Sequence, residues 1–96
     1  MDQNQILEII RQEKPFLQEK FGLLSIGLFG SYAKGFQNIE SDIDFLVELS
    51  EPRFDLLAGL QIYLEKRLGR PVDIIRKRKG MRMSFLSGIE KEIRYA

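Results

Sequence analysis

Apolar residues at helical spacing open the chain. From position 6 onward they recur every three or four residues, which predicts an amphipathic helix that Asp2 or Asn4 caps and Gly22 ends. Pro15 lies inside this segment, so we expect it to interrupt the helix, either as a kink or as a point where the helix restarts. The residues on the apolar face are Ile6, Ile9, Ile10, Leu17 and Phe21.

Two strands separated by a small-residue turn are predicted next. Residues 24–29 form a short apolar run that Gly30 stops, and residues 31–34 have room for only one helical turn before Gly35. Residues 42–49 alternate between apolar and mostly polar positions, as expected for the strongest strand of the chain. Ile43, Phe45, Val47 and Leu49 share one face of this strand, while Asp42, Asp44, Leu46 and Glu48 share the other.

The second half of the chain predicts a helix, a strand and a last helix. An apolar stripe after the Glu51-Pro52 turn gives the first of these helices, which Gly69 ends. Residues 72–75 form a brief strand, and Ser84 is placed to cap the last helix. The first stripe consists of Phe54, Leu57, Leu60, Leu64 and Leu68, and the second of Phe85, Leu86, Ile89 and Ile93.

This order of elements indicates an α/β (α+β) domain with helices packed on a small mixed sheet of about three strands. The short connection between the first two strands favours an antiparallel pair, and the helical connection from the second to the third favours a parallel pair. With 96 residues, the chain has room for one modest core, so we expect residues 1–96 to form a single domain.

Composition restricts the chemistry available to this domain. Fifteen basic and fourteen acidic residues give a net charge of +1, which favours neither nucleic acid nor an anionic membrane as partner. The chain has no cysteine and no histidine, so disulfides, thiolate metal sites and the commonest general base are excluded. Without a signal-peptide pattern or a long apolar run, we expect a cytoplasmic protein. Any metal site must use carboxylates, which suit Mg²⁺ or Mn²⁺.

Three carboxylates are predicted to meet at one end of the sheet. Asp42 and Asp44 lie on one strand face with their backbone positions about 6.6 Å apart. A third strand parallel to theirs would bring Asp73 in from the side. Because nearby carboxylates repel one another, at least one pKa would rise unless a counter-charge were present. A pair of divalent cations bridged by acidic side chains would supply that charge and is a standard device for displacement at phosphorus.

A small-residue turn is predicted to lie beside these carboxylates. An antiparallel pairing of the first two strands puts Gly30 and Ser31 at the same end of the sheet as Asp42 and Asp44. Gly30 lacks a Cβ and would let a phosphate approach the backbone, while Ser31 offers a hydroxyl and an N–H group. Lys34, one helical turn on, is placed to add a positive charge, although a solvated surface lysine is an equal alternative.

The segments FGSYAKG and SDIDFLVE, followed by an aspartate on the next strand, resemble the DNA polymerase beta-type nucleotidyltransferase superfamily. Within it, the short chain is similar to the minimal nucleotidyltransferases (MNT), antitoxins that pair with a HEPN ribonuclease toxin. The resemblance extends over nearly the whole chain. It implies a nucleotidyltransferase fold and a type VII-like antitoxin that transfers AMP from ATP to a tyrosine of the toxin, within a heteromeric complex.

The resemblance also implies roles for individual residues. Gly30 and Ser31 would hold the triphosphate, and Lys34 occupies a position where the family usually has arginine or lysine. Asp42 and Asp44 would bind two Mg²⁺ ions, while Asp73 would complete the metal site and help to deprotonate the attacking hydroxyl. The polymerase and tRNA-modifying members of the superfamily carry extra domains for nucleic acid. This chain has no room for them, so we expect no direct nucleic-acid partner.

Two further surfaces could contact the nucleotide or a partner. The basic run Arg76 to Arg82 is most simply a solvated loop, and the alternative is a contact with the nucleotide or with an acidic partner. Phe36 and Ile39 lie in the predicted loop between the first two strands and are candidates for an exposed partner contact.

Two alternative functions compete with protein adenylylation. A non-catalytic antitoxin could neutralise its toxin by binding alone, with the acidic site kept as a relic or a regulatory metal site. A transferase for a small molecule would share the chemistry but would need an acceptor pocket, which is usually supplied by an added domain. The presence of all three carboxylates and of the Gly-Ser pair favours the enzyme.

Overall fold

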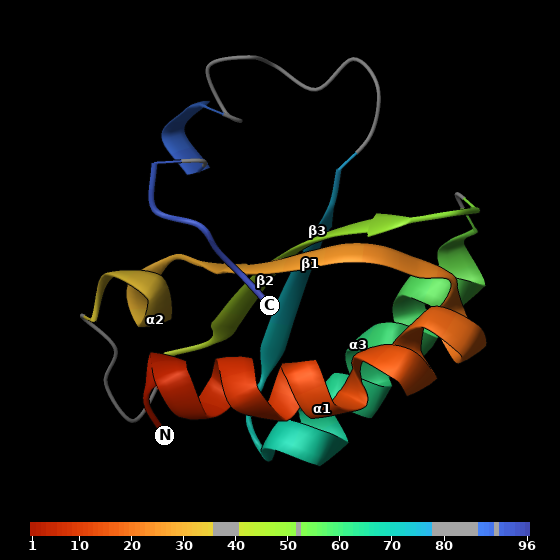
Figure 1. Cartoon of the computed structure of the whole chain (residues 1–96), viewed down its shortest axis with the longest axis horizontal. Helices are drawn as coiled ribbons and strands as arrows, with labels where there is room; N and C mark the ends of the chain where they lie inside the picture. The colour runs from red at the N-terminus through yellow and green to blue at the C-terminus, as the bar shows by residue number, and fades with distance from the viewer. Residues whose placement is uncertain (36–40, 52, 78–86, 90) are drawn as a thin grey trace.

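The structure, a computed structural model, describes residues 1–35, 41–51, 53–77, 87–89 and 91–96. Its elements follow the predicted order until the last segment (Figure 1). They are α1 (Gln3–Phe21), β1 (Leu23–Phe29), α2 (Ser31–Lys34), β2 (Ile43–Leu49), α3 (Phe54–Leu68), β3 (Val72–Arg76) and β4 (Arg94–Tyr95).

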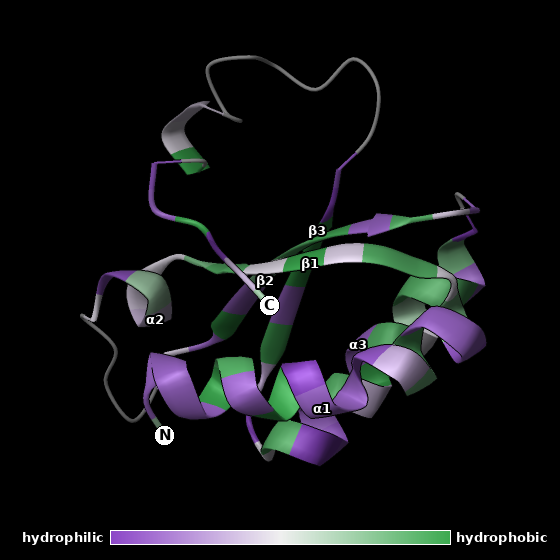
Figure 2. Cartoon of the chain, in the orientation of Figure 1, coloured by the Kyte–Doolittle hydropathy of each residue, from purple (hydrophilic) through white to green (hydrophobic). Residues whose placement is uncertain are grey.

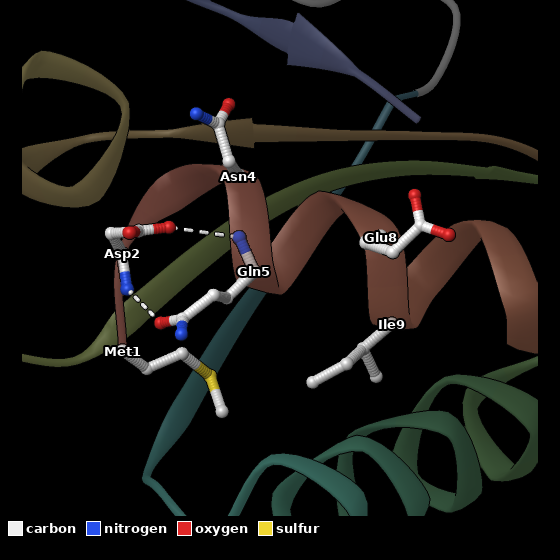
Figure 3. A pocket seen from close by; sticks show the side chains of 6 residues that line it. All are labelled: Met1, Asp2, Asn4, Gln5, Glu8 and Ile9. Carbon is white, nitrogen blue, oxygen red and sulfur yellow. Dashed lines mark hydrogen bonds between the residues drawn. The ribbon is translucent and has the colours of Figure 1, made fainter.

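The first helix begins at a capping box. Asp2 is the N-cap, and its carboxylate accepts a hydrogen bond of 2.9 Å from the backbone N–H of Gln5. The Gln5 side chain returns a bond of 2.9 Å to the backbone N–H of Asp2, as the dashed lines in Figure 3 show. Gly22 ends the helix in the left-handed conformation. The predicted restart at Pro15 is wrong, because one helix continues from Gln3 to Phe21 with Pro15 inside it.

The burial of the helix explains why Pro15 is tolerated. Proline removes one backbone hydrogen bond, but residues on both sides of it belong to the buried face of α1. Ile10 precedes Pro15, and Leu17 and Phe21 follow it, all in the main core. Most helical stability in proteins comes from such tertiary packing, which here extends past the proline.

The sheet is mixed, as predicted, and has the strand order β3-β2-β1-β4. β1 pairs with β2 antiparallel, and β2 pairs with β3 parallel. The prediction of about three strands missed β4, which pairs antiparallel with Gly27 and Leu28 of β1. A strand of two residues leaves no alternation in the sequence for such a prediction to use.

The end of the chain departs from the predicted last helix. Residues 87–89 are helical, but the chain turns at residues 91 and 92, and Ile93 leads directly into β4. Its side chain packs over Gly27, where an added Cβ would lie 2.5 Å from the Ile93 Cδ1 atom. Ile93 therefore lies against the sheet beyond the helical residues 87–89, although its N–H still donates a bond of 2.9 Å to the carbonyl of Ile89. Ser84, Phe85 and Leu86 lie outside the residues that the structure describes.

The main core lies between the sheet and the pair formed by α1 and α3, which cover the same face (Figure 1). In Figure 2 both helices carry a mixture of polar and apolar residues, while β1 is apolar along most of its length. Leu60, Leu64 and Leu68 are buried as predicted, but Phe54 at the start of α3 is 82% exposed. Phe54 is the first residue of α3, directly after the N-cap Arg53, and there the predicted stripe extends beyond the core.

Leu46 shows that the second face of the sheet is also covered in part. It was predicted on the same face as Asp44, and its side chain is only 2% exposed although it lies outside the main core cluster. Its strand neighbours are Gly27 on β1 and Ile75 on β3. Within the described part of the chain, no helix is long and apolar enough to cross a membrane.

Candidate active site

Strand pairing brings the predicted site residues to one end of the sheet. Asp44 on β2 lies opposite Phe29, the last residue of β1, and opposite Asp73 on β3. Gly30 directly follows Phe29, and Asp42 directly precedes β2. Strand pairing therefore confirms that the Gly-Ser turn and the three carboxylates lie at one end of the sheet, but the three carboxylates do not converge closely enough to hold an ion.

Asp44 is the least exposed of the three carboxylates. It is half-buried, whereas Asp42 and Asp73 are exposed. Burial raises the pKa of Asp44 above its ordinary value, and the negative charges of Asp73 and Asp42 raise it further. Ionisation of Asp44 in this site is therefore less favourable than ionisation of an isolated aspartate in water.

Gly30 fits against Asp44 in a way that other residues could not. Its φ of 74° and ψ of −152° belong to a backbone region that only glycine adopts readily. A Cβ at this position would overlap a carboxylate oxygen of Asp44 and lie 3.1 Å from its Cγ atom. Glycine is therefore required both by the backbone conformation and by the space that the carboxylate occupies.

Tyr32 holds the turn in place, a role that the sequence analysis missed. It is the buried residue of α2, only 3% exposed, and its ring belongs to the main core. Because α2 has four residues, this anchor fixes the neighbouring Ser31, which is half-buried, and Gly30. An aromatic residue between Ser31 and Ala33 is the signal in the sequence that could have revealed this anchor.

Lys34 contacts a carboxylate outside the predicted site. Its ammonium nitrogen lies 3.1 Å from a carboxylate oxygen of Glu92, in the segment that precedes β4. Both side chains are partly exposed, so the pair contributes little to stability. A phosphate that recruited Lys34 would have to compete with Glu92.

Arg70 supports the backbone next to Asp42. One of its guanidinium nitrogens donates a hydrogen bond of 2.9 Å to the carbonyl oxygen of Ser41. The N–H of Ile43 donates a bond of 3.0 Å to the carbonyl of Pro71, so residues on both sides of Asp42 are tied to the start of β3. Sequence reasoning could not find Arg70, because its partner is distant in the chain and no motif joins them.

The donor set fits divalent cations, although no metal cluster is already assembled. Among the residues the structure describes, no three Asp, Glu, His or Cys side chains converge closely enough to hold an ion. Yet the charges that raise the pKa of Asp44 are those a divalent cation would neutralise, and the donors are hard carboxylate oxygens. The residues present therefore fit Mg²⁺ or Mn²⁺.

The structure describes only part of the two further surfaces that the sequence predicts as contacts. Arg76 belongs to β3, and the N–H of Lys77 bonds to the carbonyl of Val47. The rest of the basic run, with Phe36 and Ile39, lies outside the described residues. An open pocket of about 690 Å³ lies at the start of α1 (Figure 3), and none of the predicted site residues lines it.

A mixed sheet with a glycine turn and an Asp-x-Asp strand beside a third aspartate is the arrangement expected of a nucleotidyltransferase. The sequence profile of the nucleotidyltransferase domain matches residues 10–96, and the chain belongs to this family. The fold and the enzyme class implied by the resemblance are thereby confirmed.

Archaeal relatives extend along almost the whole chain. A protein of Methanocaldococcus jannaschii with the provisional name protein adenylyltransferase MJ1379 is 43% identical over 95 residues, which cover 96% of this chain and 95% of the relative. Protein adenylyltransferase MntA of Thermococcus cleftensis is 39% identical over 90 residues, which cover 93% and 86%.

A solved structure shows the same fold in a complex. It is a crystal structure of a toxin-antitoxin with AMP-PNP, 25% identical, with a TM-score of 0.69. The match covers 99% of this chain and 72% of that one. The expected similarity to antitoxin-type nucleotidyltransferases is therefore confirmed.

Proposed function

We propose that this protein is an antitoxin that transfers AMP from ATP to a hydroxyl group, most simply a tyrosine, of a cognate HEPN ribonuclease toxin. The observation that carries this proposal is the alignment of Gly30, Asp44 and Asp73 across three neighbouring chain segments at one end of the sheet. The adenylyltransferase relatives and the toxin-antitoxin complex with AMP-PNP support the nucleotide and the kind of partner.

The Gly-Ser turn receives the triphosphate in this proposal. Ser31 offers its hydroxyl and N–H groups to a phosphate. Gly30 gives the turn its conformation and lets it lie against Asp44. Lys34 adds positive charge after it exchanges Glu92 for a phosphate oxygen. Tyr32 keeps this turn beside the carboxylates throughout.

The three carboxylates act on the reacting groups. Asp42, Asp44 and Asp73 would hold two Mg²⁺ ions, which when bound neutralise charge on the triphosphate and on the leaving group. The acceptor oxygen forms a bond to the α-phosphorus, the bond from that phosphorus to the β-phosphate oxygen breaks, and pyrophosphate leaves. Asp73 helps to take the hydroxyl proton, for which its exposed position at the edge strand leaves room.

An experiment in cells separates catalysis from simple binding. The proposed cognate HEPN toxin is expressed in cells with the wild type, with Asp44→Ala or with the surface control Lys66→Ala. The proposal predicts that the wild type and the control protect the cells, whereas Asp44→Ala still co-purifies with the toxin but does not protect. Full protection by Asp44→Ala would contradict the proposal and favour neutralisation by contact alone.

A further inference from the structure

The edge strand that carries Asp73 is held from outside the sheet by α3. β3 pairs with β2 on one side only. On its other side, the N–H of Val72 donates a hydrogen bond of 3.0 Å to the Glu65 carboxylate. The Gln61 amide donates a bond of 2.9 Å to the carbonyl of the same valine. Both backbone groups of Val72 are thus bound by side chains one helical turn apart.

This double contact lies next to the candidate metal site. Val72 directly precedes Asp73, and its side chain is only 2% exposed in the main core. On the opposite side of the strand, register places Val72 beside Ile43 and Asp73 beside Asp44. A shift of β3 by a fraction of an ångström would therefore change the separation of the Asp44 and Asp73 carboxylates.

We infer that Gln61 and Glu65 are positioning residues, which set the location of Asp73 relative to Asp44 for metal binding. The inference rests on the proposed metal site and names two residues of α3 that contact neither the metal nor the nucleotide in that proposal. An edge strand without this support could slide or fray, because it has a sheet partner on one side only. Residues that orient metal ligands typically change metal affinity by about 10-fold to 100-fold when replaced.

Mn²⁺ binding without nucleotide tests the inference directly. The dissociation constant is measured by electron paramagnetic resonance on the whole chain, well below the melting temperature of each variant. We expect Gln61→Ala and Glu65→Ala each to raise it by about tenfold. Glu65→Gln keeps an oxygen acceptor for the Val72 N–H and should remain within about threefold of the wild type. The control Lys66→Ala, exposed on the same helix, should bind Mn²⁺ as the wild type does.

The outcomes distinguish this inference from the proposed function. A folded Glu65→Ala protein with unchanged Mn²⁺ affinity overturns the positioning role alone. If Glu65→Ala does not fold, Gln61→Glu replaces it, because this change keeps the side-chain size but turns an oxygen toward the Val72 carbonyl. Unchanged Mn²⁺ affinity in Gln61→Glu would then overturn the positioning role. A wild type that binds Mn²⁺ no better than Asp44→Asn overturns the metal site and the positioning role with it.

Discussion

Replacement of Gly30 by alanine isolates the contact between the turn and the carboxylates. The new Cβ would overlap a carboxylate oxygen of Asp44, and the backbone conformation would become strained. Such strain costs on the order of 2 kcal/mol. For a domain of this size, we expect a fall of roughly 8 to 16 °C in melting temperature.

Gly69→Ala is the matched control. Gly69 also has a positive φ, at 69°, but a Cβ there meets nothing within 4 Å. Its left-handed conformation should cost about 1 kcal/mol, or roughly 4 to 8 °C in melting temperature. It lies at the end of α3 and should leave metal binding and AMP transfer unchanged.

The assay combines thermal unfolding with Mn²⁺ binding and AMP transfer at a temperature where both variants are folded. Gly30→Ala should lower Mn²⁺ affinity by about tenfold or more, because Asp44 must move away from its neighbours. The reasoning is refuted if Gly30→Ala loses no more stability than Gly69→Ala and transfers AMP at the rate of the wild type.

Four other predictions follow from the charged groups. Without metal, Asp44→Asn should raise the melting temperature by a few degrees while abolishing Mn²⁺ binding. Because the pKa of Asp44 is raised in the folded protein, the wild type should lose part of its stability as the pH rises through that pKa. Melting curves that do not change between pH 4 and 8 would contradict this prediction. Lys34→Ala should raise the KM for ATP, whereas Glu92→Gln should lower it or leave it unchanged; equal increases in steady-state assays would contradict the phosphate role. Tyr63→Phe removes the hydrogen bond that holds the pKa of Glu13 down, so it should cost about 1 kcal/mol at neutral pH. That difference in unfolding free energy should shrink as pH falls through the Glu13 pKa, and a constant difference would count against it.

Periodicity and glycine positions carried most of the fold prediction. Gly22 and Gly69 end the two long helices in the left-handed conformation, and the alternation of residues 42–49 marks β2. These signals are local, because each depends on residues a few positions apart. The helix does not restart at Pro15, because local preference is outweighed by the packing of Leu17 and Phe21.

The candidate site could be predicted because its residues lie at the ends of strands. Once the directions of β1, β2 and β3 were inferred, the location of Gly30, Asp44 and Asp73 followed from register. The surrounding contacts could not be predicted in this way. The Lys34 pair with Glu92 and the Arg70 bond to Ser41 depend on side-chain positions that only the assembled fold determines.

The most direct test is the intact mass of the proposed cognate HEPN toxin after incubation with this protein, ATP and Mg²⁺. We expect a gain of one or more AMP units with the wild type and none with Asp44→Asn or when Mg²⁺ is removed by EDTA. An unchanged toxin mass with the wild type, while the two proteins form a stable complex, would contradict the proposed function.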